Sequence, residues 1–452
     1  MKAAFFEGPG RIEVRETPDP VCPPGGLLTR VEACAICGTD LRSFDFGSRH
    51  KGQISGHETV GTVVEVGEGV TGFKVGDRVT DCPVTCGECG FCRTGVNNLC
   101  PTRGRVGGVA QGGFAEMRPI LASAVSGGFV VKVPPELPAE TATLIEPLAC
   151  VINGNEKLDV KPDTTVAIIG SGPIGVLHLI LAKLRGAGEI TMVDLKDERL
   201  DQAGPFGAGH LVNAAKTDPV ARVREFTGGV GADVVVVACV SASAQAQAVE
   251  MAAKRGQVLM FAGLPESSPT ATLNVNLIHY NELRLIGARS SVKRQWDLAL
   301  DLLMTGKVSG PGVVNASVPL ERIQEGFEMV RSGKVLKVAV KPQHHLHWAE
   351  PARGVPSEGD RQLAEAPEGA ALSHPGTTSG PYSRMSPGWH ASSRQMASSV
   401  ENLTALALPV LRIERLASVI PTRSARSVSE ILRSTMTRSS RTIIAMSSSP
   451  RP

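Results

Sequence analysis

Five of the ten cysteines lie in the twenty residues DCPVTCGECGFCRTGVNNLC, which run from Asp81 to Cys100. Four thiolates in one short loop can close a tetrahedron around zinc with no open position, as in structural zinc sites. An iron–sulfur cluster also takes four cysteines, and Pro101 follows the last one, so spacing alone leaves both interpretations open. Cys82 stands outside the set, and we expect it to be a small buried hydrophobe. The four candidate ligands follow the spacing C-x2-C-x2-C-x7-C and are Cys86, Cys89, Cys92 and Cys100.

A second motif, G-S-G-P-I-G, lies between an apolar run and a helical stretch. Its first glycine permits a tight turn, its second lets a pyrophosphate approach the backbone, and its third lets helix and strand pack closely. Phosphates would then meet the N–H groups of the helix N-terminus. Asp194 closes the next strand and would accept hydrogen bonds from the adenosine ribose, which favours NAD over NADP, although Lys196 weakens that preference. The motif residues are Gly170, Gly172, Pro173, Ile174 and Gly175.

The elements that must position these residues fall into two groups. Residues 1–152 alternate short β-rich runs with Gly and Pro, which predicts a compact β domain. From Thr164 the pattern becomes strand, turn and helix, which predicts a parallel sheet covered on both faces over 153–290. Residues 291–341 are expected to return to the first domain. The predicted fold is therefore α/β with two domains.

Composition argues against a membrane protein and a nucleic-acid-binding protein. No run of roughly 18 to 20 apolar residues is present, and the start of the chain lacks the apolar core of a secretory signal, so we expect a cytoplasmic protein without a membrane partner. In a reducing compartment, clustered cysteines more often bind metal than form disulfides. The net charge of +3 is not concentrated in any basic run, and we expect no nucleic-acid partner.

Residues 342–452 differ from the rest of the chain. This segment contains no lysine and is rich in Ser, Pro, Gly and Arg. Such a composition buries too little apolar surface to offset its ordering entropy, so we expect most of the segment to be disordered.

Three further motifs lie before the cysteine loop. They are AICGTD, with Cys37, Thr39 and Asp40; the pattern G-H-E-x2-G-x5-G-x2-V from Gly56 through Val70; and GDRV at residues 76–79. Together with the cysteine loop and the glycine motif, they resemble the zinc-containing medium-chain alcohol and polyol dehydrogenases over residues 1–341. The resemblance implies a GroES-like β domain, a Rossmann domain, NAD, and two zinc ions per subunit, with the four-cysteine loop as the structural zinc lobe.

The resemblance also implies a catalytic zinc held by Cys37 and His57 with an acidic partner. The family's alcohol dehydrogenases have a cysteine where this chain has Glu146, in IEPLAC, which is similar to the polyol and threonine dehydrogenase branch. Either Glu58 or Glu146 could bind the zinc directly, while the other reaches it through water. Cys150 lies four residues beyond the matching position and is the weaker alternative ligand.

Other roles follow from the same resemblance. Asp40 would orient the zinc ligands, and Thr39 would pass the released proton toward the nicotinamide ribose. Many relatives end this relay with a histidine, but Arg42 stands there and is a poor proton acceptor. Arg289, after the last strand of the dinucleotide domain, is a weaker candidate for contact with the substrate.

We therefore expect oxidation of a polyol or another secondary alcohol by NAD. Cys37, Thr39, His57, Glu58 and Glu146 form the expected catalytic site. An L-threonine 3-dehydrogenase-like enzyme and a catalytically silent NAD-binding protein are the alternatives. By resemblance, the subunits would form a homodimer or homotetramer.

Overall fold

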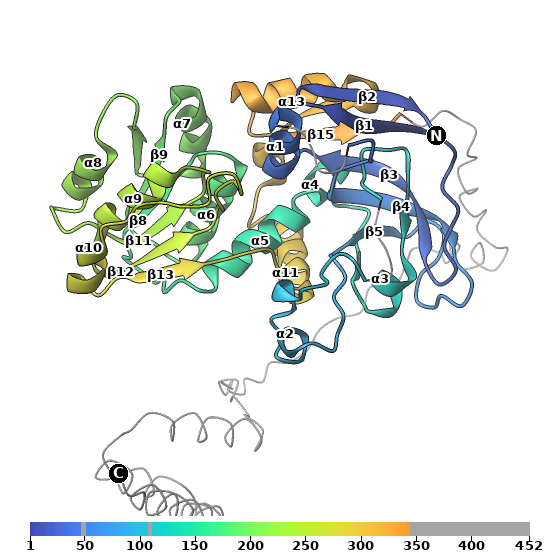
Figure 1. Ribbon diagram of the computed structural model, residues 1–452, viewed down its shortest axis with the longest axis horizontal. Coiled ribbons are helices and arrows are strands. Elements are labelled where there is room, and N and C mark those ends of the chain that lie inside the picture. The colour runs from blue at the N-terminus through green and yellow to red at the C-terminus, as the bar shows by residue number, and fades with distance from the viewer. Residues whose placement is uncertain (47–50, 107–110, 344–452) are drawn as a thin grey trace, which may run out of the picture. The chain divides into compact units, whose positions relative to one another are not determined.

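A computed structural model describes residues 1–46, 51–106 and 111–343 (Figure 1). The prediction of disorder for 342–452 falls almost entirely outside these residues. In the described residues, no helix is long and apolar enough to cross a membrane.

The first part of the chain is built on a seven-stranded sheet. Its order is β14-β15-β3-β4-β5-β7, and β6 also pairs with β3. The last two strands in sequence thus join a sheet that begins near the N-terminus, through β15 against β3. A separate hairpin, β1 with β2, lies beside it. The strands are β1 (Lys2–Gly8), β2 (Arg11–Glu16), β3 (Leu27–Ala35), β4 (Glu58–Val66), β5 (Arg78–Asp81), β6 (Met117–Ile120), β7 (Val130–Lys132), β14 (Val314–Pro319) and β15 (Lys337–Lys341).

The second sheet is parallel, with the order β10-β9-β8-β11-β12-β13. In chain order this is 3-2-1-4-5-6, the order of a dinucleotide-binding Rossmann fold. Buried β-branched residues dominate β8 and β11, because helices cover both faces of the sheet. Its strands are β8 (Val166–Ile169), β9 (Ile190–Asp194), β10 (His210–Asn213), β11 (Ala232–Val237), β12 (Ala252–Met260) and β13 (Arg284–Gly287).

Helices connect and cover these sheets. The α-helices are α1 (Gly38–Phe46), α2 (Gly90–Arg93), α3 (Ala122–Ser126), α4 (Ala139–Ala142), α5 (Ile145–Asn155), α6 (Pro173–Leu184), α7 (Asp197–Ala203), α8 (Pro219–Phe226), α9 (Ala242–Met251), α10 (Val275–Tyr280), α11 (Lys293–Met304), α12 (Gly310–Val313) and α13 (Ile323–Ser332). The 3-10 turns are η1 (Asn97–Leu99), η2 (Gly204–Phe206) and η3 (Leu320–Arg322).

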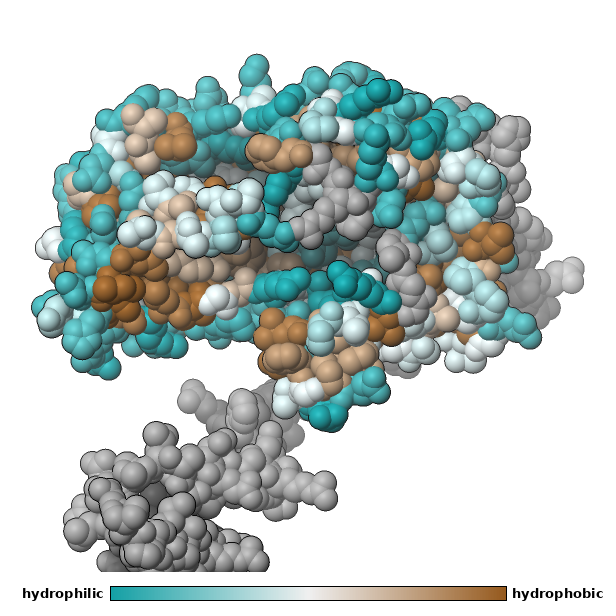
Figure 2. Space-filling view, in the orientation of Figure 1, coloured by the Kyte–Doolittle hydropathy of each residue, from teal (hydrophilic) through white to brown (hydrophobic). Residues whose placement is uncertain are grey.

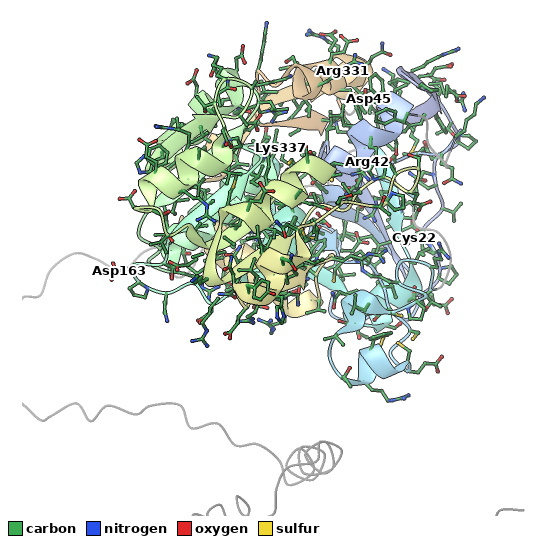
Figure 3. The ribbon with its side chains drawn as sticks, turned by 60° about the vertical axis from the view of Figure 1, so that its left-hand side comes forward. Cys22, Arg42, Asp45, Asp163, Arg331 and Lys337 are labelled. Atoms are coloured by element: carbon green, nitrogen blue, oxygen red, sulfur yellow. The ribbon has the colours of Figure 1, made fainter. Side chains whose placement is uncertain are left out.

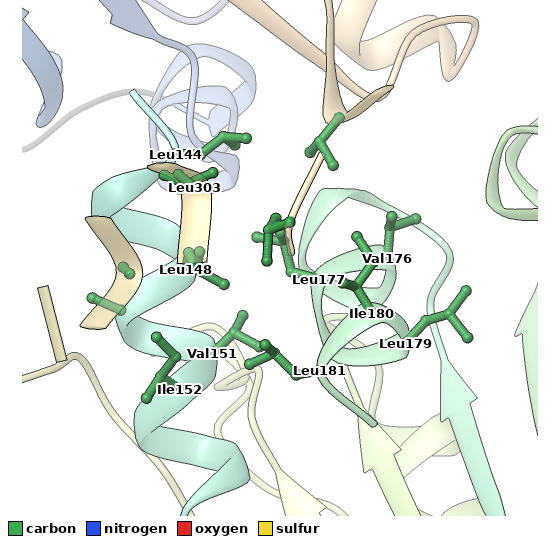
Figure 4. Packing of buried hydrophobic residues seen from close by; sticks show 14 of the residues in the cluster. Leu144, Leu148, Val151, Ile152, Val176, Leu177, Leu179, Ile180, Leu181 and Leu303 are labelled. Carbon is green, nitrogen blue, oxygen red and sulfur yellow. The ribbon is translucent and has the colours of Figure 1, made fainter. Parts of the chain in front are cut away.

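One core links the two sheets through α5. Leu148 and Val151 on α5 face Leu177 and Leu181 on α6 (Figure 4), and all belong to one buried cluster. The boundary predicted between residues 152 and 153 therefore falls inside a helix. The helix continues across it to Asn155, and the residues on both sides of the boundary are buried. The α/β fold class is confirmed, whereas the domain boundaries stay predictions.

Candidate functional site

The four-cysteine loop forms a tight sulfur cluster. The Sγ atoms of Cys89 and Cys92 are 3.5 Å apart, those of Cys86 and Cys100 are 3.6 Å apart, and those of Cys86 and Cys92 are 3.9 Å apart. A zinc ion with Zn–S bonds of about 2.3 Å requires sulfurs roughly 3.8 Å apart at the corners of a tetrahedron. Backbone N–H groups also donate to two of the sulfurs. The geometry fits a closed zinc site. Cys82 stands apart, donating to the Phe129 carbonyl at 3.1 Å, and burial raises the pKa of this thiol to about 12.

A second cluster brings together Cys37, His57 and Glu58. One ligand atom from each lies within 4.8 Å of the others. Burial opposes protonation of His57, but the negative charges of Cys37 and Asp40 outweigh it and raise the pKa of the imidazole. A bound cation would neutralise the same negative charges. The donor set of sulfur, nitrogen and oxygen suits zinc.

Local structure explains how Cys37 and His57 meet. Cys37 immediately precedes α1, and its N–H donates to Asp40 Oδ2 at 3.0 Å. The other oxygen of Asp40 accepts from Ser55 at 2.9 Å and lies 3.8 Å from His57 Nδ1. The buried Asp40 carboxylate therefore ties together both segments that carry the cluster. Gly56 has φ +97°, and a Cβ there would meet Cys34 Sγ at 2.6 Å, so only glycine fits before His57.

Packing fixes α1 from its other end. The Phe44 ring lies 5.0 Å from the Phe327 ring of α13, and Asp45 forms an ion pair with Arg331 at 3.4 Å (Figure 3). These contacts hold α1 against the C-terminal part of the chain. Cys37 and Thr39 are thereby placed by residues far from them in sequence.

Glu58 has a partner that the sequence did not suggest. Its Oε2 lies 2.5 Å from Lys337 Nζ, and both side chains are buried. Lys337, labelled in Figure 3, belongs to β15 and also donates to the Ile36 carbonyl at 3.3 Å. Within the described residues, Glu58 Oε1 is buried with neither a hydrogen bond nor an ion pair, whereas Oε2 has the ion pair with Lys337. One oxygen is thus held by Lys337, and the other remains for a metal ion.

Glu146 lies at the start of α5 and lines the same cavity, but its carboxylate does not belong to the three-residue cluster. Cys150, one helical turn later, donates to Glu146 Oε1 at 3.4 Å. Burial raises the pKa of the Cys150 thiol. Cys150 therefore contacts Glu146, and neither residue belongs to the cluster.

The glycine motif has the conformation that its sequence predicts. Gly170 has φ +106°, and a Cβ on Gly175 would lie 1.8 Å from the Gly170 carbonyl oxygen. Pro173 and Ile174 open α6, while the Gly172 backbone stays open to approach. Such a cradle fits a dinucleotide pyrophosphate. Asp194 Oδ2 accepts from Ser171 N–H at 2.7 Å, which places this carboxylate against the turn.

Arg199 lies beside the glycine turn and was not singled out from the sequence. It lies on α7, and its Nη1 would be 3.5 Å from a Cβ on Gly172. Its Nη2 donates to the Val330 carbonyl at 3.1 Å, whereas Nη1 is buried without a partner in the part of the chain that the structure describes. The signal available in the sequence was a basic residue shortly after Asp194, at the start of a helix. The ammonium of Lys196, by contrast, donates to the Ser332 carbonyl at 3.3 Å.

The cluster and the end of the parallel sheet share one cavity of about 980 Å³. From the first sheet it is lined by Cys37, Thr39, Arg42, His57, Glu58 and Glu146. From the second sheet it is lined by Ile174, residues 260–263 and residues 287–290. Figure 2 shows a hollow on this face of the molecule. Such a cavity has room for a nicotinamide and a small substrate beside the metal cluster.

Comparisons with known proteins agree with this geometry. The family described as alcohol dehydrogenase GroES-like domain matches residues 23–135, and the family described as zinc-binding dehydrogenase matches residues 173–305. A sorbitol dehydrogenase of Halalkalibacterium halodurans is 31% identical over 74% of this chain and 97% of its own length. An L-threonine 3-dehydrogenase of Bacillus licheniformis is 31% identical over 70% of this chain and 91% of its own length.

Two solved structures extend the comparison. Alcohol dehydrogenase TADH from Thermus sp. ATN1 superimposes with a TM-score of 0.69 at 31% identity, covering 76% of this chain and 100% of that one. A zinc-binding dehydrogenase from Sinorhizobium meliloti 1021, bound to NADP, has a TM-score of 0.69 at 30% identity, covering 75% of this chain and 99% of that one.

The fold and the site together define a metal-dependent dehydrogenase that uses a nicotinamide cofactor. The chain belongs to the zinc-containing medium-chain alcohol dehydrogenase family and is an oxidoreductase. The predicted fold, family and enzyme class are confirmed.

Proposed function

We propose that the protein oxidises a secondary alcohol of the polyol class with NAD, giving a ketone. One observation carries the proposal: the cluster of Cys37, His57 and Glu58 opens into the cavity that also receives the carboxyl ends of the Rossmann strands. In open parallel sheets that edge binds the cofactor. Substrate and nicotinamide would therefore meet beside the metal.

Cys37, His57 and Glu58 Oε1 would hold the catalytic zinc, and the four-cysteine loop would hold the structural one. Glu146 would act through water, because its carboxylate lies outside the cluster while facing the same cavity. Asp40 would orient His57 and Cys37 through its buried contacts.

When bound, zinc lowers the pKa of an alcohol oxygen and NAD accepts the hydride. The protein's own part is to position both reactants and to move the proton. Thr39 lines the cavity, where its hydroxyl can accept the alcohol proton and pass it on. Arg42 lines the cavity as well, but its guanidinium stays protonated, so water would receive the proton after Thr39.

NAD is the proposed cofactor in preference to NADP. The Asp194 carboxylate faces the glycine turn, where it would bind ribose hydroxyls and repel a 2'-phosphate. The Arg199 guanidinium beside it would remain available to either cofactor. A direct comparison of reduction rates with NAD and NADP tests this preference.

A polyol is favoured over threonine because Glu146 can accept hydrogen bonds from additional hydroxyls near the metal. L-Threonine stays the alternative substrate, since a threonine dehydrogenase is similarly related. The test measures NADH formation by the zinc-loaded protein with sorbitol, xylitol and L-threonine. Turnover of the polyols alone supports the proposal, whereas turnover of threonine alone replaces it with the alternative.

We also propose that the protein pairs with a second copy of itself. β13 hydrogen-bonds to β12 alone among the described strands, so its outer edge is open. Val275, Tyr280 and Leu285 are exposed on α10 and β13, where apolar side chains gather in Figure 2. An open edge beside apolar side chains favours strand pairing between two copies.

A further inference from the structure

The charged side chains that line the cavity include more arginines than carboxylates. Its carboxylates are Glu58, Asp81 and Glu146, and its guanidiniums belong to Arg42, Arg103, Arg118 and Arg289. Arg118 binds both oxygens of Asp81, and Glu58 is paired with Lys337. Glu146 therefore shares the cavity with three arginines that are not paired with another carboxylate there. Across the described ranges, the side chains of these three form no hydrogen bond or ion pair with a protein group.

Two of the three arginines, Arg103 and Arg289, line the same cavity and act on each other through their charges. The charges that act on Arg103 come from Glu146, Cys150, Arg289 and Cys82. Burial lowers the pKa of Arg103, and the like charge of Arg289 lowers it further, whereas Glu146 raises it. The fold thus places one half-buried and one exposed guanidinium on the same cavity, an arrangement that an anion would stabilise.

The backbone of Arg289 is held by hydrogen bonds from two other parts of the chain. Its carbonyl accepts from Asn98 Nδ2 of the cysteine lobe at 2.9 Å and from Asn153 Nδ2 of α5 at 3.3 Å. Asn153 also donates to the Ser290 carbonyl at 2.7 Å. Ser290 has φ +55°, an uncommon conformation for a residue other than glycine. Arg289 is therefore held at the cavity wall by specific contacts.

The cofactor does not account for this pair. Its pyrophosphate would lie at the glycine turn, where the N-terminus of α6 and Arg199 supply positive charge. Arg199 does not line the cavity, whereas Arg103 and Arg289 do. The groups that act on Arg103 are Glu146, Cys150, Arg289 and Cys82, and none of them is in the glycine turn.

We propose that Arg103 and Arg289 bind an oxyanion carried by the substrate, so that the preferred substrate is an acidic polyol, either a hydroxy acid or a polyol phosphate. Guanidiniums match carboxylate and phosphate oxygens in paired hydrogen bonds. This inference rests on the proposed function, because it names the substrate class for the same site.

The test uses the zinc-loaded full-length protein and three substrates: sorbitol, gluconate and sorbitol 6-phosphate. We expect one of the two anions to exceed sorbitol in kcat/KM, and the anion that does so identifies the oxyanion. Arg103→Gln and Arg289→Gln should each lower kcat/KM for that anion on the order of 10- to 100-fold more than for sorbitol. Arg105→Gln is the matched control, since Arg105 is exposed in the same loop and does not line the cavity.

A binding measurement keeps this inference separate from the proposed function. Calorimetric titration of the NAD-bound protein with gluconate and sorbitol 6-phosphate should show binding that Arg103→Gln and Arg289→Gln weaken and Arg105→Gln preserves. Turnover of sorbitol without any preference for an anion would overturn the inference and leave the proposed function standing. Anion binding that depends on both arginines, with no turnover of any substrate, would support the inference and count against the proposed reaction. The absence of both binding and turnover would overturn both.

Discussion

Lys337 Nζ lies 2.5 Å from Glu58 Oε2, and both side chains are almost completely buried. Burial alone would lower the pKa of Lys337, but the charges of Glu58, Cys37 and Glu146 and the hydrogen bond to Glu58 together outweigh it, and the pKa is raised. The last strand of the chain thus supplies the counter-charge for a residue of the metal cluster. Glu58 Oε1 would therefore be available to a metal ion, because Oε2 is paired with Lys337.

Lys337→Met should destabilise the protein because it leaves the Glu58 charge buried and unpaired. Losing one partner of a buried ion pair costs about 3 to 5 kcal/mol. Urea unfolding at neutral pH measures the loss. Lys337→Met combined with Glu58→Gln should recover most of it, since the uncompensated charge is then gone. A double variant no more stable than Lys337→Met would contradict this explanation.

Cys92→Ser should remove one zinc ion per chain, because three sulfurs no longer close the tetrahedron. Metal analysis should fall from two zinc ions to one, and the loop from Cys82 to Gly104 should become sensitive to protease. Cys82→Ala is the control, since Cys82 lies outside the sulfur cluster. Loss of zinc from the control, or its retention in Cys92→Ser, would contradict the assignment.

His178 predicts a specific dependence of stability on pH. Its ring is buried against Phe261, Nδ1 lies 2.8 Å from Asn155 Nδ2, and burial lowers the pKa to about 3. The unfolded chain takes up this proton near pH 6.5, but the folded chain does not. The contribution of His178 to the free energy of unfolding is therefore fully present above pH 6.5. It is lost as the pH falls below that value, by about 2 kcal/mol between pH 7 and pH 5.

The comparison of wild type with His178→Gln isolates this contribution. Urea unfolding of both proteins from pH 7.5 to about 5 should show a steeper loss for wild type. Equal slopes would mean that His178 becomes protonated in the folded state.

Leu285→Asp should disrupt the proposed pairing of two copies along β13. The residue is 40% exposed, so the change should leave the fold of each subunit intact. Light scattering should give a multiple of the chain mass for wild type and a smaller multiple for the variant. Leu298→Asp, similarly exposed on α11, is the matched control. A wild-type protein that is monomeric at micromolar concentration would exclude the pairing.

Much of the fold and site could be read from local sequence. The cysteine spacing and the glycine motif could be recognised because each is built within one short segment. Gly175 is predictable since its closest neighbour, the Gly170 carbonyl, is only five residues away. Lys337 was not predictable, because it is one lysine in an apolar strand and meets Glu58 only when β15 joins β3. Arg103 was missed for the same reason, since its surroundings come from α5 and the end of β13.

The central claim is that Cys37, His57 and Glu58 hold a second zinc ion that the reaction requires. The most direct test is zinc content per chain, measured on the same samples as NADH formation, for wild type and for Cys37→Ala combined with His57→Gln. We expect two zinc ions and polyol oxidation in wild type, and one zinc ion with no turnover in the variant, with circular dichroism unchanged. A wild-type protein that oxidises polyols with a single zinc ion, or a variant that keeps both ions, would contradict the claim.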